Sequence, residues 1–366
     1  MKYSLGNMKA ATDLTKSGKL LEATALIQRM LSKNTKPDPA DFQAAPSQQP
    51  KLPSTGQGQK AAEAAVTKAT ANIRLATPKV RNDQGQFESK HFSCALGQRT
   101  YKLFTPSGYL GKPMPLIIML HGCTQTPDDF AAGTKMNEVA EQLGFFVAYP
   151  AQPSSANASR CWNWFNTADQ QKDKGEPALI AGIVREIIAH HAVDPKRVYV
   201  AGLSAGGAMA AVLGMTYPDL FAAIGVHSGL PCGAAKDVVS AFTTMKRGAS
   251  HAVGSKSMQP VPTIVFHGDR DRTVNPANAD DVLEQFAPPG APERYETTSE
   301  KSAAGFSYSK SVHANDNGTA MFEKWLVHGA GHAWSGGSSH GSYTEPRGPD
   351  ASREMIRFFF EHRLTT

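Results

Sequence analysis

One short stretch constrains the fold of this chain more than any other. Residues 197–207 read Arg-Val-Tyr-Val-Ala-Gly-Leu-Ser-Ala-Gly-Gly, an apolar run that leads into Gly-x-Ser-x-Gly, and small residues follow it. A serine hydroxyl is a weak nucleophile, so it must stand on a tight turn where a base can reach it. Gly202 and Gly206 lack the Cβ atoms that would collide in such a turn. The stretch predicts a strand, a turn carrying Ser204 as nucleophile, and a helix; the alternative is a serine that only caps the helix.

Short apolar runs alternate with longer amphipathic ones from about residue 87 onward. The strand candidates are 99–104, 115–120, 145–149, 197–201, 222–226, 263–266 and 320–327. The helix candidates are 135–143, 177–190, 205–215, 276–286 and 351–362. Near-continuous apolar strands that alternate with helices predict an α/β fold, with a mostly parallel central sheet covered by helices on both faces. Residues 87–366 are therefore expected to form the catalytic domain.

The segment before residue 87 has a different texture. Residues 1–33 carry apolar side chains at helical spacing and predict an amphipathic helix, whereas residues 34–86 are rich in Pro, Gln and Ala and predict a linker. Charged and polar residues interrupt every apolar run of the first helix, so no secretory signal is expected. The chain also contains no stretch of 18 apolar residues, which excludes a transmembrane helix.

The net charge of +6 is confined to the N-terminal part of the chain. Residues 1–90 hold 14 Lys and Arg against 7 Asp and Glu, whereas the remainder holds 24 against 25. The catalytic region is thus almost neutral, and no nucleic-acid partner is expected. The charge leaves one alternative of another class, a protein that binds granules or an acidic surface through residues 1–90.

An activated serine needs a histidine as base and a carboxylate to orient that histidine. His332 lies in a glycine-rich loop directly after the last strand candidate, with His328 as its rival. Asp271 is the preferred carboxylate and Asp269 the alternative, because both follow the strand candidate 263–266. The order serine, aspartate, histidine is that of the α/β-hydrolases.

Acyl transfer also requires hydrogen-bond donors for the oxyanion that develops on the substrate. The strand candidate 115–120 runs into His121, Gly122 and Cys123, where the loop after such a strand supplies one backbone N–H. We assign this donor to Cys123, with Gly122 as the alternative. The second donor is the N–H of Ala205, the residue after the nucleophile.

Several longer strings resemble the polyhydroxybutyrate depolymerase-type esterases of the α/β-hydrolase superfamily. They are LIIMLHGCTQTPDDFAAGTKMNEVAEQLGFFVAYPAQ, CWNWF, RVYVAGLSAGGAMAAVLGMTYPDLFAAIGVHSG, HGDRDRTV and GAGHAWSGG, and they cover most of residues 87–366. The resemblance implies an α/β-hydrolase fold with Ser204, Asp271 and His332 as the triad. It also implies a carboxylic-ester hydrolase that needs no metal and no other cofactor. The expected substrate is a poly(3-hydroxyalkanoate) polymer or oligomer, and the alternative is a feruloyl or acetylxylan ester.

The aromatic residues and cysteines near these motifs suggest two further features. Trp162, Trp334 and His121 are candidates for lining a substrate pocket, with loop packing as the alternative. The four cysteines form no Cys-x-x-Cys pair, which argues against a zinc site. A disulfide between Cys123 and Cys161 would rigidify the oxyanion loop, with Cys232 as another possible partner. Because no secretory signal is expected, the sequence predicts the cytoplasm, and the alternative is the extracellular compartment of many members of the resembling family, which a disulfide would favour.

Overall fold

A computed structural model describes residues 85–249, 257, 260–287 and 296–365. The chain divides into Met1–Arg81 and Asn82–Thr366, and the described residues belong to the second unit. The N-terminal helix and nearly all of the linker predicted from the sequence lie outside the described residues.

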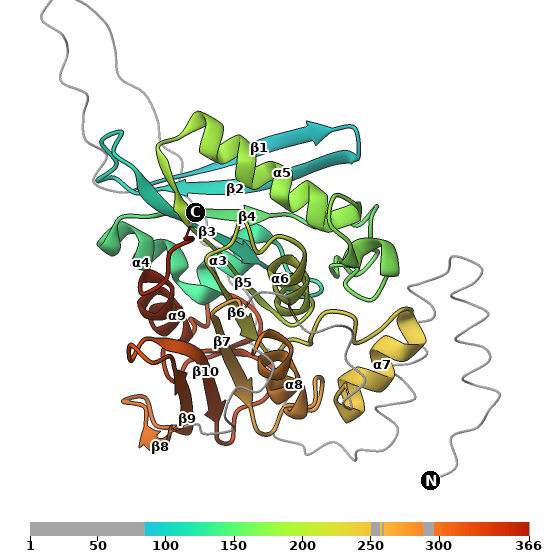
Figure 1. Ribbon diagram of the computed structural model, residues 1–366, viewed down its shortest axis with the longest axis vertical. Coiled ribbons are helices and arrows are strands. Elements are labelled where there is room, and N and C mark those ends of the chain that lie inside the picture. The colour runs from blue at the N-terminus through green and yellow to red at the C-terminus, as the bar shows by residue number, and fades with distance from the viewer. Residues whose placement is uncertain (1–84, 250–256, 258–259, 288–295, 366) are drawn as a thin grey trace, which may run out of the picture. The chain divides into compact units, whose positions relative to one another are not determined.

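The described part of the chain is built on one ten-stranded sheet (Figure 1). Its strands are β1 (Gln86–Cys94), β2 (Gly97–Thr105), β3 (Met114–Leu120), β4 (Phe146–Pro150), β5 (Val193–Leu203), β6 (Ala223–His227), β7 (Thr263–Gly268), β8 (Glu296–Lys301), β9 (Ser307–Ala314) and β10 (Ala320–Val327). They lie in the order β1-β2-β4-β3-β5-β6-β7-β10-β9-β8. The six strands from β4 to β10 in this order are parallel, and the outer ones are antiparallel. The predicted mostly parallel sheet is confirmed.

Helices cover both faces of the sheet. The helices are α3 (Pro127–Thr134), α4 (Met136–Leu143), α5 (Gly175–His190), α6 (Ala205–Thr216), α7 (Val238–Arg247), α8 (Ala277–Phe286) and α9 (Ala351–Phe360). Side chains of α5, α6 and α8 pack into one core, and those of α3, α4 and α9 pack into the other. None of the described helices is long and apolar enough to span a membrane.

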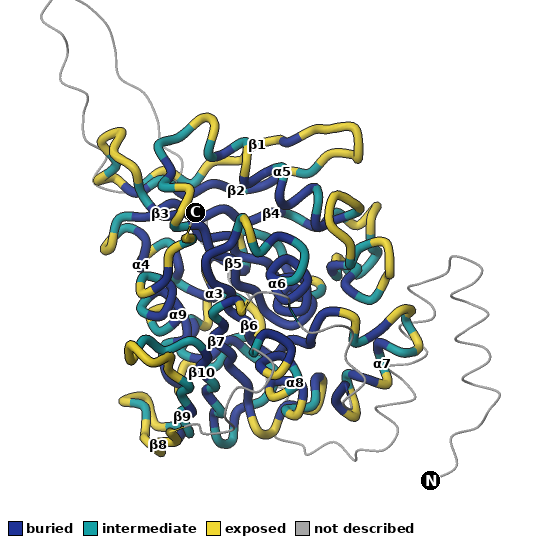
Figure 2. The backbone as a smooth tube through the Cα atoms, in the orientation of Figure 1, coloured by how far each residue is buried: buried dark blue, intermediate teal, exposed yellow. Residues whose placement is uncertain are grey.

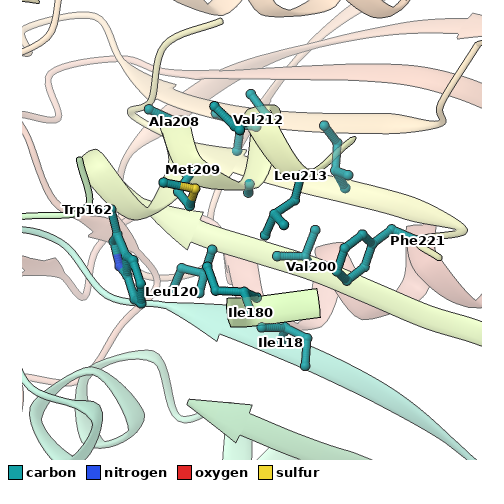
Figure 3. Packing of buried hydrophobic residues seen from close by; sticks show 14 of the residues in the cluster. Ile118, Leu120, Trp162, Ile180, Val200, Ala208, Met209, Val212, Leu213 and Phe221 are labelled. Atoms are coloured by element: carbon teal, nitrogen blue, oxygen red, sulfur yellow. The ribbon is translucent and has the colours of Figure 1, made fainter. Parts of the chain in front are cut away.

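Strand β3 shows why its sequence is apolar without interruption. Leu116, Ile118 and Leu120 belong to the first core, whereas Ile117 and Met119 belong to the second. All five side chains are fully buried, and the central strands are mostly dark in Figure 2. Figure 3 shows the first core, in which side chains of β3 and β5 face those of α5 and α6. A strand buried on both faces needs apolar residues at every position.

All seven strand candidates and all five helix candidates are present. The strands β1, β8 and β9, at the two edges of the sheet, were not predicted from the sequence. Strand β8 reads Glu-Thr-Thr-Ser-Glu-Lys, is exposed at every residue, and pairs only with β9. Such a strand carries no hydrophobic pattern, because neither of its faces packs on a core. Helix α3 was also missed; it begins at Pro127 with Thr126 as its cap, and Lys135 in a left-handed conformation separates it from α4.

Candidate active site

Ser204 occupies the turn between β5 and α6 at the carboxyl edge of the sheet. Its backbone has φ 57° and ψ −118°, and its N–H donates to the carbonyl of His227 at 2.9 Å. A non-glycine residue in such a conformation costs about 1–3 kcal/mol and persists only where its surroundings enforce it. The Ser204 side chain makes no capping hydrogen bond to α6, which removes the interpretation as a simple helix cap.

Two glycines allow this turn to form against the neighbouring strand. A Cβ on Gly202 would collide with the backbone of Gly206, and a Cβ on Gly206 would collide with the carbonyl oxygen of Leu120. The start of α6 therefore lies directly against the end of β3. This backbone contact brings Ser204 next to the loop that follows β3.

Asp271 and His332 form a buried pair on the loops after β7 and β10. His332 Nδ1 lies 2.7 Å from Asp271 Oδ2, and Asp271 Oδ1 accepts hydrogen bonds from the N–H groups of Thr273 and Val274 at 2.8 and 2.9 Å. The Asp271 side chain is fully buried and that of His332 is 12% exposed. His332 Nε2 has no hydrogen-bond partner among the described residues. This nitrogen is therefore available to accept a proton.

The charge on Asp271 is held by its neighbours. Burial alone would raise the pKa of the carboxyl group, but hydrogen bonds and electrostatic attraction from His267 and His332 outweigh burial and hold that pKa well below its usual range. An ionised Asp271 accepts a hydrogen bond from the Nδ1–H of His332. This hydrogen bond favours the tautomer of His332 that carries its proton on Nδ1, in which Nε2 is the nitrogen that can act as a base.

The rival aspartate and histidine also pair with each other. His328 Nδ1 lies 3.0 Å from Asp269 Oδ2, and His328 Nε2 lies 2.8 Å from Ser309 Oγ. Ser309 is in the middle of β9, which pairs with a strand on each side. Ser309 therefore lies within a paired strand and not on a turn between a strand and a helix, which is the setting of Ser204. This set instead links β9 to the turns after β7 and β10.

His227 connects the His332 loop to the Ser204 turn. Its carbonyl accepts the N–H of Ser204, and its Nε2 accepts the N–H of Ser335 at 2.9 Å. Its ring stacks on Trp334 with centroids 5.0 Å apart. Burial, followed by the proximity of His267 and His332, holds the pKa of His227 well below its usual value. The neutral ring of His227 therefore joins the segment after His332 to the turn at Ser204.

The loop after β3 favours Cys123 over Gly122 as the predicted oxyanion donor. The Gly122 N–H donates to Oε1 of Gln125 at 2.9 Å and is therefore occupied. Among the described residues, neither the Cys123 N–H nor the Ala205 N–H has an acceptor. A Cβ on Gly122 would lie 3.6 Å from the Cβ of Ser204, so the loop and the nucleophile are neighbours.

The disulfide expected between Cys123 and Cys161 is confirmed. The two Cα atoms are 4.2 Å apart, and the Thr124 N–H donates to the Ser159 carbonyl at 2.7 Å beside the bond. Cys232 is not a partner, because it is a buried free thiol whose pKa burial raises to about 12. The candidate oxyanion residue is thus covalently attached to the loop that carries the CWNWF motif.

Glu176 stabilises the loop that carries the CWNWF motif. Its carboxylate accepts hydrogen bonds from the backbone and side-chain N–H groups of Asn163, both at 2.7 Å, and from the amide of Gln152. The same Gln152 amide donates to the Cys161 carbonyl at 2.9 Å. The segment that holds the disulfide is thereby fixed to the start of α5.

The structure does not support the three predicted pocket residues. Trp162 and Trp334 expose 0% and 1% of their surface, and His121 exposes 1%. The Trp162 indole donates to the His121 carbonyl, and the Trp334 indole donates to Oγ of Ser352, both at 3.1 Å. With no accessible surface, these three side chains pack the loops against the sheet and do not line a pocket. Aromatic residues close to a motif suggested contact with substrate, but burial decided otherwise.

Gln125 and His227 hold the loops of the site together, and neither was predicted from the sequence. Gln125 is 2% exposed and donates from Nε2 to Asp129 and Ser342, which joins the loop after β3 to a segment more than 200 residues later. His227 carried a readable signal, because it ends an apolar strand in the same way as His121 and His267. The part of the chain that the structure describes contains no group of three or more His, Cys, Asp or Glu able to hold a metal.

The parallel sheet, the Ser204 turn and the loops at its carboxyl edge define the α/β-hydrolase fold. An acetyl xylan esterase from Aspergillus awamori has a similar structure, with a TM-score of 0.56 and 22% identity over 72% of this chain and 94% of that one. A family model described as esterase PHB depolymerase matches residues 99–290, and this chain belongs to that family.

Individual relatives include enzymes with different names. Poly(3-hydroxyalkanoate) depolymerase C of Paucimonas lemoignei is 37% identical over 238 residues, which are 62% of this chain and 56% of the depolymerase. Feruloyl esterase B of Neurospora crassa is 32% identical over 202 residues, 50% of this chain and 68% of the esterase. The chain therefore spans little more than half the length of the first of these relatives.

We expect two of the four cysteines to react with a thiol reagent in denatured, unreduced protein. Cys94 and Cys232 are free, whereas Cys123 and Cys161 are joined. Titration in a denaturant before and after reduction measures the difference, and the reduced sample serves as the control. Four free thiols without reductant would contradict the disulfide.

We expect stability to fall as the pH decreases, because of His121. Its Nε2 accepts the Gln152 N–H at 3.1 Å, and burial lowers the pKa of its ring to about 4. The unfolded chain binds a proton at this ring below its usual pKa of about 6.5. The unfolded state thus binds more protons between these values, and the free energy of unfolding decreases by about 3 kcal/mol as the pH falls from about 6.5 to 4.

Urea unfolding at several pH values measures this decrease. The variant His121→Gln retains a hydrogen-bond acceptor and loses the titrating ring, so its stability depends less steeply on pH than that of the wild type. Buried His227 contributes to the slope in both proteins. An unchanged slope in the variant would show that His121 does not titrate in this way.

Proposed function

We propose that the protein is a carboxylic-ester hydrolase with Ser204 as nucleophile, His332 as base and Asp271 as the residue that orients the base. The observation that carries the proposal is the strained turn at Ser204, together with a histidine whose Nδ1 is bonded to a buried carboxylate and whose loop is joined to that turn through His227. Membership of the esterase PHB depolymerase family supports the same chemistry.

The mechanism follows from these roles. Ser204 Oγ attacks the ester carbonyl carbon while His332 Nε2 accepts the hydroxyl proton, and Asp271 stabilises the resulting imidazolium. The N–H groups of Cys123 and Ala205 donate to the oxyanion. The imidazolium then protonates the departing alcohol, which leaves an acyl-enzyme. Water attacks the acyl group with His332 again as base, and the carboxylic acid is released.

The proposed substrate is poly(3-hydroxybutyrate) or another hydroxyalkanoate polymer or oligomer. The match to the Paucimonas depolymerase is longer and more identical than the match to the Neurospora feruloyl esterase. Feruloyl or acetylxylan esters are the second candidate, because relatives with those names match half of the chain. No organic cofactor enters the proposed reaction.

The disulfide also supports a proposal about compartment. Disulfides persist where thiols are not kept reduced, so we propose the extracellular alternative for this protein and not the cytoplasm. Thiol titration of protein isolated from its native host tests this proposal, and free Cys123 and Cys161 would contradict it.

We expect ester turnover to depend on Ser204 and to be greatest on hydroxybutyrate substrates. The panel consists of amorphous poly(3-hydroxybutyrate), its soluble oligomers, a methyl ferulate and acetylated xylan, with product release as the measurement. Ser204→Ala should lower kcat by about 10⁵-fold or more. The matched control is Ser309→Ala, which removes the serine that is bonded to the rival histidine His328 and should retain turnover.

Two outcomes would contradict parts of this proposal. If Ser204→Ala turns over substrate at the wild-type rate, the assignment of Ser204 as nucleophile is wrong. Faster turnover of the ferulate or the acetylated xylan than of the hydroxybutyrate substrates would favour the second candidate.

We expect the two aspartates to differ sharply in their effect on activity. Asp271→Asn should lower kcat by about 10³–10⁴-fold, because the amide stabilises the wrong tautomer of His332. Asp269→Asn should change kcat by less than about 10-fold, since its partner His328 is half exposed and bonded to Ser309. Hydrolysis of p-nitrophenyl butyrate measures both. Equal losses would show that the assignment of the carboxylate is wrong.

A further inference from the structure

Tyr343 is an exposed aromatic residue beside the candidate oxyanion loop. It exposes 47% of its surface and belongs to the few large hydrophobic residues that are exposed in the described part of the chain. The others are Leu96, Leu110, Leu143 and Val239. Trp162 and Trp334, the aromatic residues that the sequence suggested as a surface for the substrate, are buried. Tyr343 is an exposed aromatic residue that the sequence did not single out.

The hydroxyl of Tyr343 contacts the loop that follows β3. Its oxygen lies 3.3 Å from Oγ1 of Thr124, the residue directly after Cys123. The Thr124 hydroxyl donates a hydrogen bond to the Cys123 carbonyl at 2.6 Å. In the bond between Thr124 and Tyr343, the phenol of Tyr343 is therefore the donor. The Tyr343 hydroxyl is thereby one residue away from the candidate oxyanion N–H.

The backbone of Tyr343 is joined to the loop that carries the base. Its carbonyl accepts the Trp334 N–H at 2.7 Å, and β11 (Trp334–Ser335) pairs with β12 (Thr344–Glu345) immediately beyond it. Trp334 is two residues after His332. Tyr343 therefore connects the candidate oxyanion loop to the base loop, and its side chain is exposed where the two loops meet.

The backbone of Tyr343 has an uncommon, strained conformation. Its φ is 52°, in the left-handed region that bulky residues avoid. The neighbouring residues enforce this, because Ser342 donates from N and Oγ to Asp129 at 2.9 and 2.6 Å. A half-exposed ring gains little burial energy from such a position. Strain of this kind is found where a side chain must be presented to a ligand.

We infer that Tyr343 is a specificity-determining residue whose ring contacts the aliphatic part of the acyl group of the ester. This inference rests on the proposed function. The hydroxyl is already bonded to Thr124, so the ring offers an apolar face and not a hydrogen bond to the substrate. The carboxylate oxygens of Asp129 accept hydrogen bonds from Ser342 and Gln125, so they are occupied as acceptors. An uncharged hydroxyalkanoate chain, with methyl and methylene groups between its esters, fits this surface.

The test measures kcat and KM for p-nitrophenyl esters of acetate, butyrate and hexanoate and for a hydroxybutyrate oligomer. Tyr343→Ala and Tyr343→Asn both remove the ring, and Asn tolerates the left-handed backbone. We expect kcat/KM for the hexanoate ester and the oligomer to fall about 10-fold, mainly through KM, and for the acetate ester to fall less than about 3-fold. Tyr343→Phe keeps the ring and should retain the chain-length preference of the wild type.

The matched control is Leu143→Ala. Leu143 is exposed to a similar extent, 51%, but ends α4 just before β4, at the opposite edge of the sheet from Ser204. Its removal should leave the chain-length preference unchanged. An equal loss for all esters in the Tyr343 variants would assign Tyr343 to the support of the oxyanion loop and refute the inference. Unchanged constants would refute it too.

The outcome for the wild type separates this inference from the proposed function. If the wild type hydrolyses none of the esters and a fluorophosphonate does not label Ser204, the proposed function is wrong and the role of Tyr343 is refuted with it. If the wild type hydrolyses them and the variants behave as the wild type does, only the role of Tyr343 is wrong.

Discussion

The contact between the start of α6 and the end of β3 is the constraint on which the site depends. Gly206 lies so close to the Leu120 carbonyl that no side chain can stand between them. This contact sets the distance between the Ser204 turn and the loop that carries Gly122 and Cys123. A larger residue would separate the two, and the serine would lose its position beside the candidate oxyanion donors before any catalytic group had changed.

Buried neutral histidines hold the loops around that contact. His121 follows β3 and His227 ends β6, on either side of β5, and each accepts a backbone N–H from a later segment through Nε2. His267 lies against Asp271, and its hydrogen bond and electrostatic attraction help to lower the pKa of the Asp271 carboxyl group. Imidazole suits this task because it offers a donor and an acceptor on one compact ring. Burial then keeps the rings of His121 and His227 neutral at neutral pH.

Much of the core could be predicted, because a strand that is buried on both faces consists of apolar residues at nearly every position. The strand at 115–120 is apolar at every position, and the turn at Ser204 is flanked by the glycines that it needs. The edge strands were not predictable in this way, because the pairing of β8 with β9 depends on backbone hydrogen bonds and leaves no apolar pattern. The predicted disulfide was found, whereas the aromatic pocket was not, because a tryptophan near a motif can face either the solvent or the core.

The sequence by itself determined the class of fold, the turn at Ser204 and the order of the candidate catalytic residues, because each rests on a local pattern of residue types. It left two aspartates and two histidines as alternatives. Only the tertiary structure paired Asp271 with His332 and Asp269 with His328, since these contacts join segments about 60 residues apart and depend on which loop reaches which strand end. The tertiary structure also buried Trp162 and Trp334 and left Tyr343 exposed, because exposure depends on what packs against a side chain from the rest of the fold.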